Sequence, residues 1–100
     1  MTAPLLEVAG KAFLTPFGAV LELRPEGGDT VYVDGRSDPP VVALTQPKDK
    51  PAADCVWRCP ADIMRRAVAS NRAVENAVIN GRLAIAGDMS VMARLRLAGA

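Results

Sequence analysis

Apolar and polar residues alternate with a period of two through the first half of the chain, which is typical of β-strands with one buried face. Turn-forming segments such as EGGD and GRSDPP separate these runs. The fourth run places Cys55, Trp57 and Cys59 on one face. The pattern predicts strands over residues 19–24 (AVLELR), 30–35 (TVYVDG), 41–46 (VVALTQ) and 53–60 (ADCVWRCP).

After Pro60 the apolar spacing changes to three and four residues, which predicts helices. Apolar positions 63, 64, 67 and 68 share one face of the first helix. Asn71 is expected to cap a second helix over residues 72–79, which Asn80-Gly81 ends because both residues tolerate a left-handed backbone. The buried stripe expected for the second helix is Val74, Ala77 and Val78.

The segment NGRLAIAGDMSVMARL, residues 80–95, predicts a fifth strand over residues 82–86 and a closing helix. Leu83 and Ile85 would face inward from the strand. Asp88 would cap the helix from Met89, with its inward side formed by Val91, Met92 and Leu95. At the other end of the chain, residues 5–13 predict a short helix that Gly10 weakens.

The order of strands, two helices, a strand and a helix predicts an α+β fold, with a five-stranded mainly antiparallel sheet and helices on one face. One hundred residues, half of them apolar, predict a single domain over residues 1–100 with its own core. Only four residues are aromatic, so this core must rest on aliphatic side chains.

Composition and charge exclude several classes of partner. The net charge of +1 offers no basic surface for nucleic acid. No apolar run is long enough to span a membrane. The N-terminus lacks the positive segment of a signal peptide, which predicts a cytoplasmic protein with reduced thiols.

The candidate chemistry for catalysis is sparse. The chain has no histidine, the commonest general base and metal ligand, and two cysteines cannot complete a zinc site. Cys55 and Cys59 are interpreted as buried structural thiols, with a redox role as the alternative. No serine lies in a G-x-S-x-G motif. We therefore expect no enzyme activity, no catalytic residue, no metal and no cofactor.

The glycines around the fifth strand allow two interpretations, a phosphate-binding loop or the wall of an apolar cavity. A phosphate loop needs backbone N–H groups directed at an anion, whereas the carboxylate of Asp88 would occupy that position and repel one. Met64, Met89 and Met92 fall on the predicted inward helix faces, and methionine suits surfaces that accept variable apolar shapes. Filling of gaps in the core is the alternative role for these methionines.

The segment from Ala53 to Leu97 resembles the sterol carrier protein 2 (SCP2) lipid-transfer family. The resemblance lies in ADCVW at 53–57, Asp62-Ile63 at a helix start, and AVENAVING before GRLAIAGDMSVMARLRL. The strongest matches are Gly81, Leu83, Ile85, Gly87, Asp88, Met89 and Leu95. The first half of the chain matches in strand order only, and the N-terminal helix is shorter than is usual in the family.

The resemblance implies a non-enzymatic domain that binds or transfers a sterol, fatty acid, acyl-CoA or phospholipid in a cavity between sheet and helices. Leu21 is a further inward residue, and Arg82 or Arg94 would contact a headgroup at the rim. The alternative is an SCP2-like interaction module that forms a homodimer. The ligand-binding residues expected are Phe13, Phe17, Trp57, Ile63, Met64, Val68, Val78, Leu83, Ile85, Met89, Met92 and Leu95.

Overall fold

Five strands form one sheet in the order β3-β2-β1-β4-β5 in the computed structural model, which describes residues 4–99. Only β1 and β4 run parallel, so the sheet is mainly antiparallel, as expected. The strands are β1 (Val20–Glu26), β2 (Val31–Asp34), β3 (Val41–Ala43), β4 (Cys55–Pro60) and β5 (Ala84–Gly87). The helices are α1 (Leu5–Ala12), α2 (Ala61–Ala67), α3 (Asn71–Ile79) and α4 (Ser90–Arg94).

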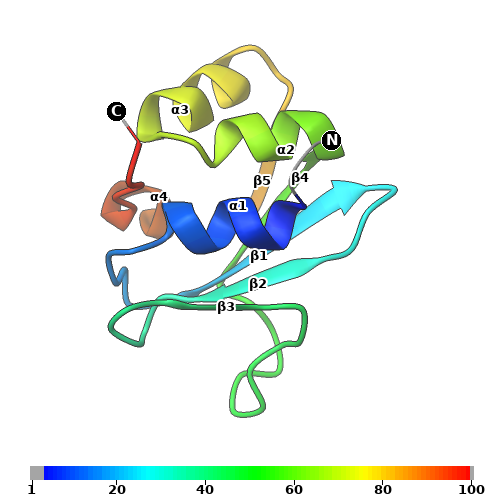
Figure 1. The fold of residues 1–100 in the computed structure, drawn as a ribbon. Helices are drawn as coiled ribbons and strands as arrows, with labels where there is room; N and C mark the ends of the chain where they lie inside the picture. The colour runs from blue at the N-terminus through cyan, green and yellow to red at the C-terminus, as the bar shows by residue number, and fades with distance from the viewer. Residues whose placement is uncertain (1–3, 100) are drawn as a thin grey trace.

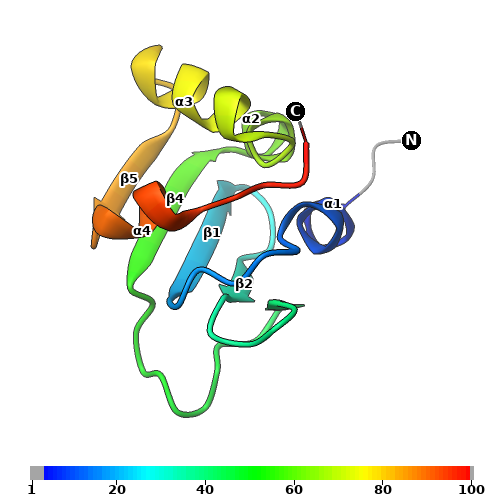
Figure 2. The ribbon, with the colours of Figure 1, turned by 90° about the vertical axis from the view of Figure 1, so that its left-hand side faces the viewer.

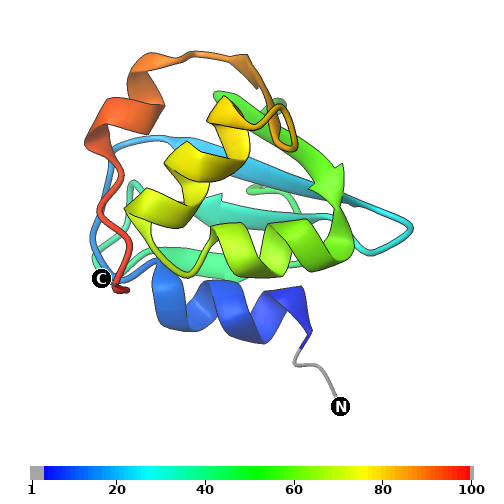
Figure 3. The same cartoon turned by 90° about the horizontal axis from the view of Figure 1, so that it is seen from above.

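All four helices cover the same face of the sheet, which confirms the α+β prediction (Figures 1, 2 and 3). The two central strands supply the middle of the core. Leu21 lies beside Cys55 and Leu23 beside Trp57 in the register of β1 and β4, and all four side chains are fully buried. The alternation seen in the sequence therefore assigns these residues to the covered face.

The N-terminal helix α1 has only eight residues, in agreement with the short helix expected. Its buried residues are Leu5, Ala9 and Ala12, which share a face at the spacing of a helix. This helix contacts α2, β2 and β3, so it covers the half of the sheet that α3 and α4 leave open.

The element ends differ from the expectation at several points. Strand β3 ends at Ala43 and is therefore shorter than predicted. Strand β5 runs from Ala84 to Gly87 and therefore begins later than predicted. The expected cap of α3 at Asn71 is wrong, because Ser70 is the N-cap and its Oγ accepts a hydrogen bond from the N–H of Ala73 over 3.0 Å. Asn71 is instead the first helical residue.

Three aromatic residues form one cluster beneath the helices. The ring of Phe13 lies 6.1 Å from that of Phe17 and 6.4 Å from that of Trp57, distances typical of packed aromatic pairs. Phe17 also lies against Gly35, where an added Cβ would clash with the ring. These aromatic side chains are therefore part of the packed core.

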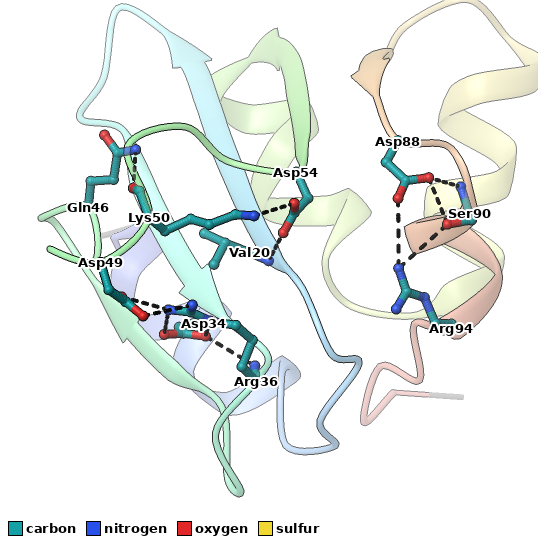
Figure 4. Close-up of polar contacts among 10 residues, drawn as sticks. All are labelled: Val20, Asp34, Arg36, Gln46, Asp49, Lys50, Asp54, Asp88, Ser90 and Arg94. Atoms are coloured by element: carbon teal, nitrogen blue, oxygen red, sulfur yellow. Dashed lines mark hydrogen bonds and ion pairs between the residues drawn. The ribbon is translucent and has the colours of Figure 1, made fainter.

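Two groups of ion pairs hold the long loop between β3 and β4 (Figure 4). The guanidinium of Arg36 binds the carboxylate of Asp49 through two hydrogen bonds of 3.0 Å, and it also binds Asp34 at the end of β2. Asp54 accepts from the N–H of Val20 over 2.8 Å and pairs with Lys50 over 2.7 Å. The middle of the loop is therefore attached to Arg36, after β2, and its end to Val20 at the start of β1.

Candidate functional site

A largely apolar groove lies between α3, β5 and α4, elements seen together in Figure 2. Its volume is about 380 Å³, at the lower end of the range of small-molecule sites. It is open to solvent at its rim, where Ile79 and Met89 are exposed; the sequence predicted a cavity between sheet and helices and left both a smaller and an open pocket possible. Its lining comprises Asn71, Val74, Glu75, Val78, Ile79, Ile85, Met89, Met92, Leu95 and Leu97.

The floor of the groove is held in place by Asn71. The Asn71 side-chain amide donates to the carbonyl of Leu95 over 2.9 Å, and its oxygen accepts from the N–H of Leu97 over 2.7 Å. Both leucines are buried, as is Val74 one turn further along α3. One polar side chain thus satisfies two backbone groups and fixes the C-terminal segment against the helix.

The rim of the groove consists of large apolar side chains that nothing covers among residues 4–99. Ile79 is 72% exposed, Met89 is 55% exposed and Val78 is 39% exposed. The predictions that Val78 is buried and that Met89 faces inward are therefore wrong, because both side chains border an open groove. Uncovered apolar side chains that adjoin one another are typical of binding surfaces.

The prediction that Asp88 caps a helix from Met89 is wrong, because Met89 is the N-cap and α4 begins at Ser90. Asp88 nevertheless binds the start of this helix. The Asp88 carboxylate accepts from the N–H of Ser90 over 2.9 Å and from its hydroxyl over 2.6 Å (Figure 4). These bonds lower the pKa of Asp88. The first helical N–H is therefore already bonded to a carboxylate and is not free to bind a phosphate.

Gly87 connects β5 to this turn at a very close approach of two backbones. Its φ is +93°, and an added Cβ would lie 2.5 Å from the carbonyl oxygen of Asp54. That same oxygen accepts from the N–H of Asp88 over 2.8 Å. Only glycine fits this geometry without a shift of the chain, so Gly87 fixes where α4 lies relative to β5.

The twelve expected ligand-binding residues are divided between the groove and other places. Val78, Ile85, Met89, Met92 and Leu95 line the groove. Ile63 borders a different, more polar depression between α2 and α3. The other six pack in the core away from the groove, namely Phe13, Phe17, Trp57, Met64, Val68 and Leu83; Leu21 packs there too.

Sequence reasoning missed half of the lining. Asn71, Val74, Glu75 and Ile79 lie on α3, and Leu97 follows α4. The α3 residues recur three and four positions apart, so they share one face with Val78. The same spacing predicts a buried core stripe, which holds for Val74 and fails for Val78, because the exposure of a helix face depends on the elements packed against it.

The two arginines expected at the rim do not line the groove. Arg82 borders the depression between α2 and α3. Arg94 lies beside Asp88 and Ser90, at 4.0 Å from the carboxylate and 3.5 Å from the hydroxyl. No cationic side chain therefore lines the groove, and Glu75 is its single charged residue.

A second groove of about 340 Å³ lies between α1, the β1–β2 turn and the start of α2. Three charged residues, Glu7, Asp29 and Arg65, line it beside Leu5, Leu6 and Leu44. It is less uniformly apolar than the groove beside α3, so it is the weaker candidate for an apolar ligand.

The two thiols lie in the core under conditions that oppose thiolate formation. Burial raises the pKa of Cys55, and it raises that of Cys59 to about 11 with the help of the charges on Glu26 and Asp62. A thiolate is the reactive form of cysteine. Residues 4–99 also contain no group of three His, Cys, Asp or Glu side chains able to hold a metal.

Within the same residues, none of the helices has the length and apolar character required to cross a bilayer. The longest helix, α3, has nine residues and carries Asn71, Arg72, Glu75 and Asn76.

Three solved structures with the same fold are SCP2 domains. One is the UbiJ-SCP2 ubiquinone synthesis protein, with a TM-score of 0.61, 17% identity, and coverage of 86% of this chain and 69% of the other. SCP2 from Yarrowia lipolytica in its apo form has a TM-score of 0.55, 21% identity, and coverage of 89% and 74%. SCP2-like 2 from Aedes aegypti has a TM-score of 0.52, 14% identity, and coverage of 89% and 82%.

No protein-family model matches the sequence, and no curated protein matches it. The resemblance to SCP2 domains seen in the sequence is confirmed for the fold, and the chain is SCP2-like in its architecture. Identities of 14% to 21% show the fold alone.

Proposed function

We propose that this SCP2-like domain binds one apolar ligand in the groove between α3, β5 and α4, without catalysing a reaction. The observation that carries the proposal is the lining, in which eight of the ten residues are apolar. Ile79, Met89 and Val78 remain exposed around a buried floor. A protein normally covers such a surface unless something binds there.

The flexible side chains of the groove suit a ligand of variable shape. Met89 and Met92 border it from the β5–α4 connection and from α4, and methionine adapts to irregular apolar surfaces. Each methylene group that leaves water contributes about 0.8 kcal/mol when fully buried, which corresponds to about a fourfold gain in affinity. Affinity should therefore rise with chain length until the groove is filled.

The names of the solved neighbours point in the same direction. Two of them are called sterol carrier proteins or sterol carrier-like, and the third is described as a ubiquinone synthesis protein. We extend to this chain the coarse class of an apolar lipid, which includes sterols, fatty acids, acyl-CoA and phospholipids. Transfer between membranes would require the ligand to leave again, which a half-open groove permits.

Binding can be tested with N-phenyl-1-naphthylamine, a neutral apolar dye whose fluorescence rises in apolar surroundings. The protein should enhance the emission of the dye, and long-chain alcohols should displace it. Val78→Asp places a carboxylate in the groove and should abolish the enhancement. Leu14→Asp is the matched control, because Leu14 is also exposed and lies outside both grooves. Equal enhancement by the two variants would contradict the assignment.

A second candidate is a homodimer formed through the same surface. Strand β5 is at the edge of the sheet, so one row of its backbone groups has no strand partner among residues 4–99. The exposed Val78, Ile79 and Met89 lie beside it. Size-exclusion chromatography with light scattering distinguishes the two, since a dimer that takes up no dye would favour the interaction module.

A further inference from the structure

The charge around the groove limits which apolar ligand can bind. Glu75 is the single charged residue of the lining, and it is exposed. It lies on α3 four residues after Asn71 and three before Val78, so it belongs to the face that borders the groove. A ligand that fills the apolar part of the groove therefore places its polar end within reach of this carboxylate.

The other polar group of the lining is already engaged. Both ends of the Asn71 amide bind backbone groups of Leu95 and Leu97. Glu75 forms no ion pair or side-chain hydrogen bond among residues 4–99. Glu75 is thus the side chain of the lining that is available to bond a ligand headgroup.

None of the nearby arginines forms an ion pair with Glu75 among residues 4–99. Arg94 lies beside Asp88 and Ser90 at the start of α4 and does not line the groove. Arg96 donates from its guanidinium to the carbonyls of Ala93 and Leu95. Arg72 lies one turn before Glu75 on α3, and the two form no ion pair. The charged group that a headgroup meets in the lining itself is therefore the carboxylate of Glu75.

We propose that Glu75 makes the groove selective for apolar ligands whose polar end donates a hydrogen bond or carries a positive charge. An ionised carboxylate only accepts hydrogen bonds. It can therefore bond a hydroxyl or an ammonium group, whereas it repels the carboxylate of a fatty acid or a phosphate ester. This inference rests on the proposed function, since it concerns the same groove.

Three ligands of equal chain length separate headgroup from tail: dodecanol, dodecylamine and dodecanoate. Each should be used at neutral pH, below its aggregation concentration, to displace N-phenyl-1-naphthylamine. Dodecanol and dodecylamine should displace the dye at concentrations roughly three to five times lower than dodecanoate. This factor corresponds to the free energy of up to about 1 kcal/mol that is typical of an exposed charge interaction.

The variant Glu75→Gln keeps the shape of the side chain and removes its charge. It should tighten dodecanoate binding and weaken dodecylamine binding, each by roughly three- to fivefold, with dodecanol little changed. Glu26→Gln is the matched control, because Glu26 is an exposed carboxylate outside both grooves. Far-UV circular dichroism should confirm that both variants are folded.

The possible failures are distinct. If dodecanoate binds the wild type as tightly as dodecanol, or if Glu75→Gln leaves dodecanoate binding unchanged, the selectivity is refuted while the apolar groove stands. If none of the three ligands displaces the dye and the dye itself does not bind, the proposed function fails and the selectivity fails with it.

Discussion

The indole Nε1 of Trp57 donates a hydrogen bond to Sδ of Met92 over 3.2 Å. Trp57 is fully buried on β4 and is the one tryptophan of the chain. Met92 is half buried on α4 and lines the groove. This contact connects the middle of the core to the wall of the candidate site, so the tryptophan can report on both.

Met92→Leu should lower the free energy of unfolding by about 1 kcal/mol, because the buried indole N–H loses its acceptor. Urea denaturation followed by far-UV circular dichroism measures the change. Met89→Leu is the control, since Met89 is exposed and should change stability by no more than about 0.5 kcal/mol. Equal effects of the two substitutions would mean that the sulfur contact contributes nothing.

Gly87→Ala should destabilise the protein by roughly 2 kcal/mol or more, because φ is +93° and the new Cβ would meet the Asp54 carbonyl. Gly10→Ala should stabilise it by about 0.5–1 kcal/mol, since Gly10 is inside α1 and an added Cβ meets nothing within 4 Å. Thermal unfolding of the two variants shows whether Gly87→Ala lowers the stability and Gly10→Ala raises it. A neutral Gly87→Ala would show that the β5–α4 connection is not held as described.

Asp54→Asn should reduce stability by up to about 1 kcal/mol at neutral pH. The ion pair with Lys50, and then the N–H of Val20, lower the pKa of Asp54. A lowered pKa means that the folded state binds the proton less readily, so the stabilisation is present above the usual aspartate pKa and is lost as the pH falls through the lowered value.

The difference between wild type and Asp54→Asn should therefore shrink as urea unfolding is repeated at increasingly acidic pH. Asp29→Asn provides the comparison, because Asp29 is exposed and forms no ion pair among residues 4–99. A difference that stays constant from neutral pH to strongly acidic pH would contradict the role given to the Asp54 charge.

Cys55 and Cys59 should resist iodoacetamide in the native protein and react fully after denaturation. Both thiols are buried and both have raised pKa values, so neither accessibility nor thiolate formation favours reaction. Mass spectrometry counts the adducts at increasing urea. Rapid modification of native protein at mildly alkaline pH would reopen the redox interpretation of this pair.

The fold could be predicted because each half of the chain carries a consistent period. Leu21, Leu23, Trp57 and Cys59 alternate with polar neighbours, and the structure buries all four. The glycine turns were equally clear, since Gly81 and Gly87 both adopt positive φ. Such local patterns depend on neighbours in sequence, so they can be recognised without the tertiary structure.

The site was only partly predictable from the sequence, because a residue lines a groove only where no other part of the chain covers it. Val78 and Val74 have the same side chain on the same helix, and one is 39% exposed while the other is buried. Which part of α3 is covered depends on where the distant segment with Leu95 and Leu97 lies, and the spacing along α3 does not contain that information. Phe13 and Phe17 illustrate the opposite error, since large apolar residues expected at a ligand site instead pack on Trp57 and Gly35.

Amide NMR spectra recorded during titration with dodecanol test the central claim most directly, because they locate the ligand without assuming where it binds. The account predicts saturating shifts concentrated at Val74, Val78, Ile79, Ile85 and Met92, accompanied by a change at the indole N–H of Trp57. Saturating shifts concentrated at Leu5, Leu6 and Leu44, which line the other groove, would contradict it, as would the absence of any shift up to the solubility limit of the alcohol.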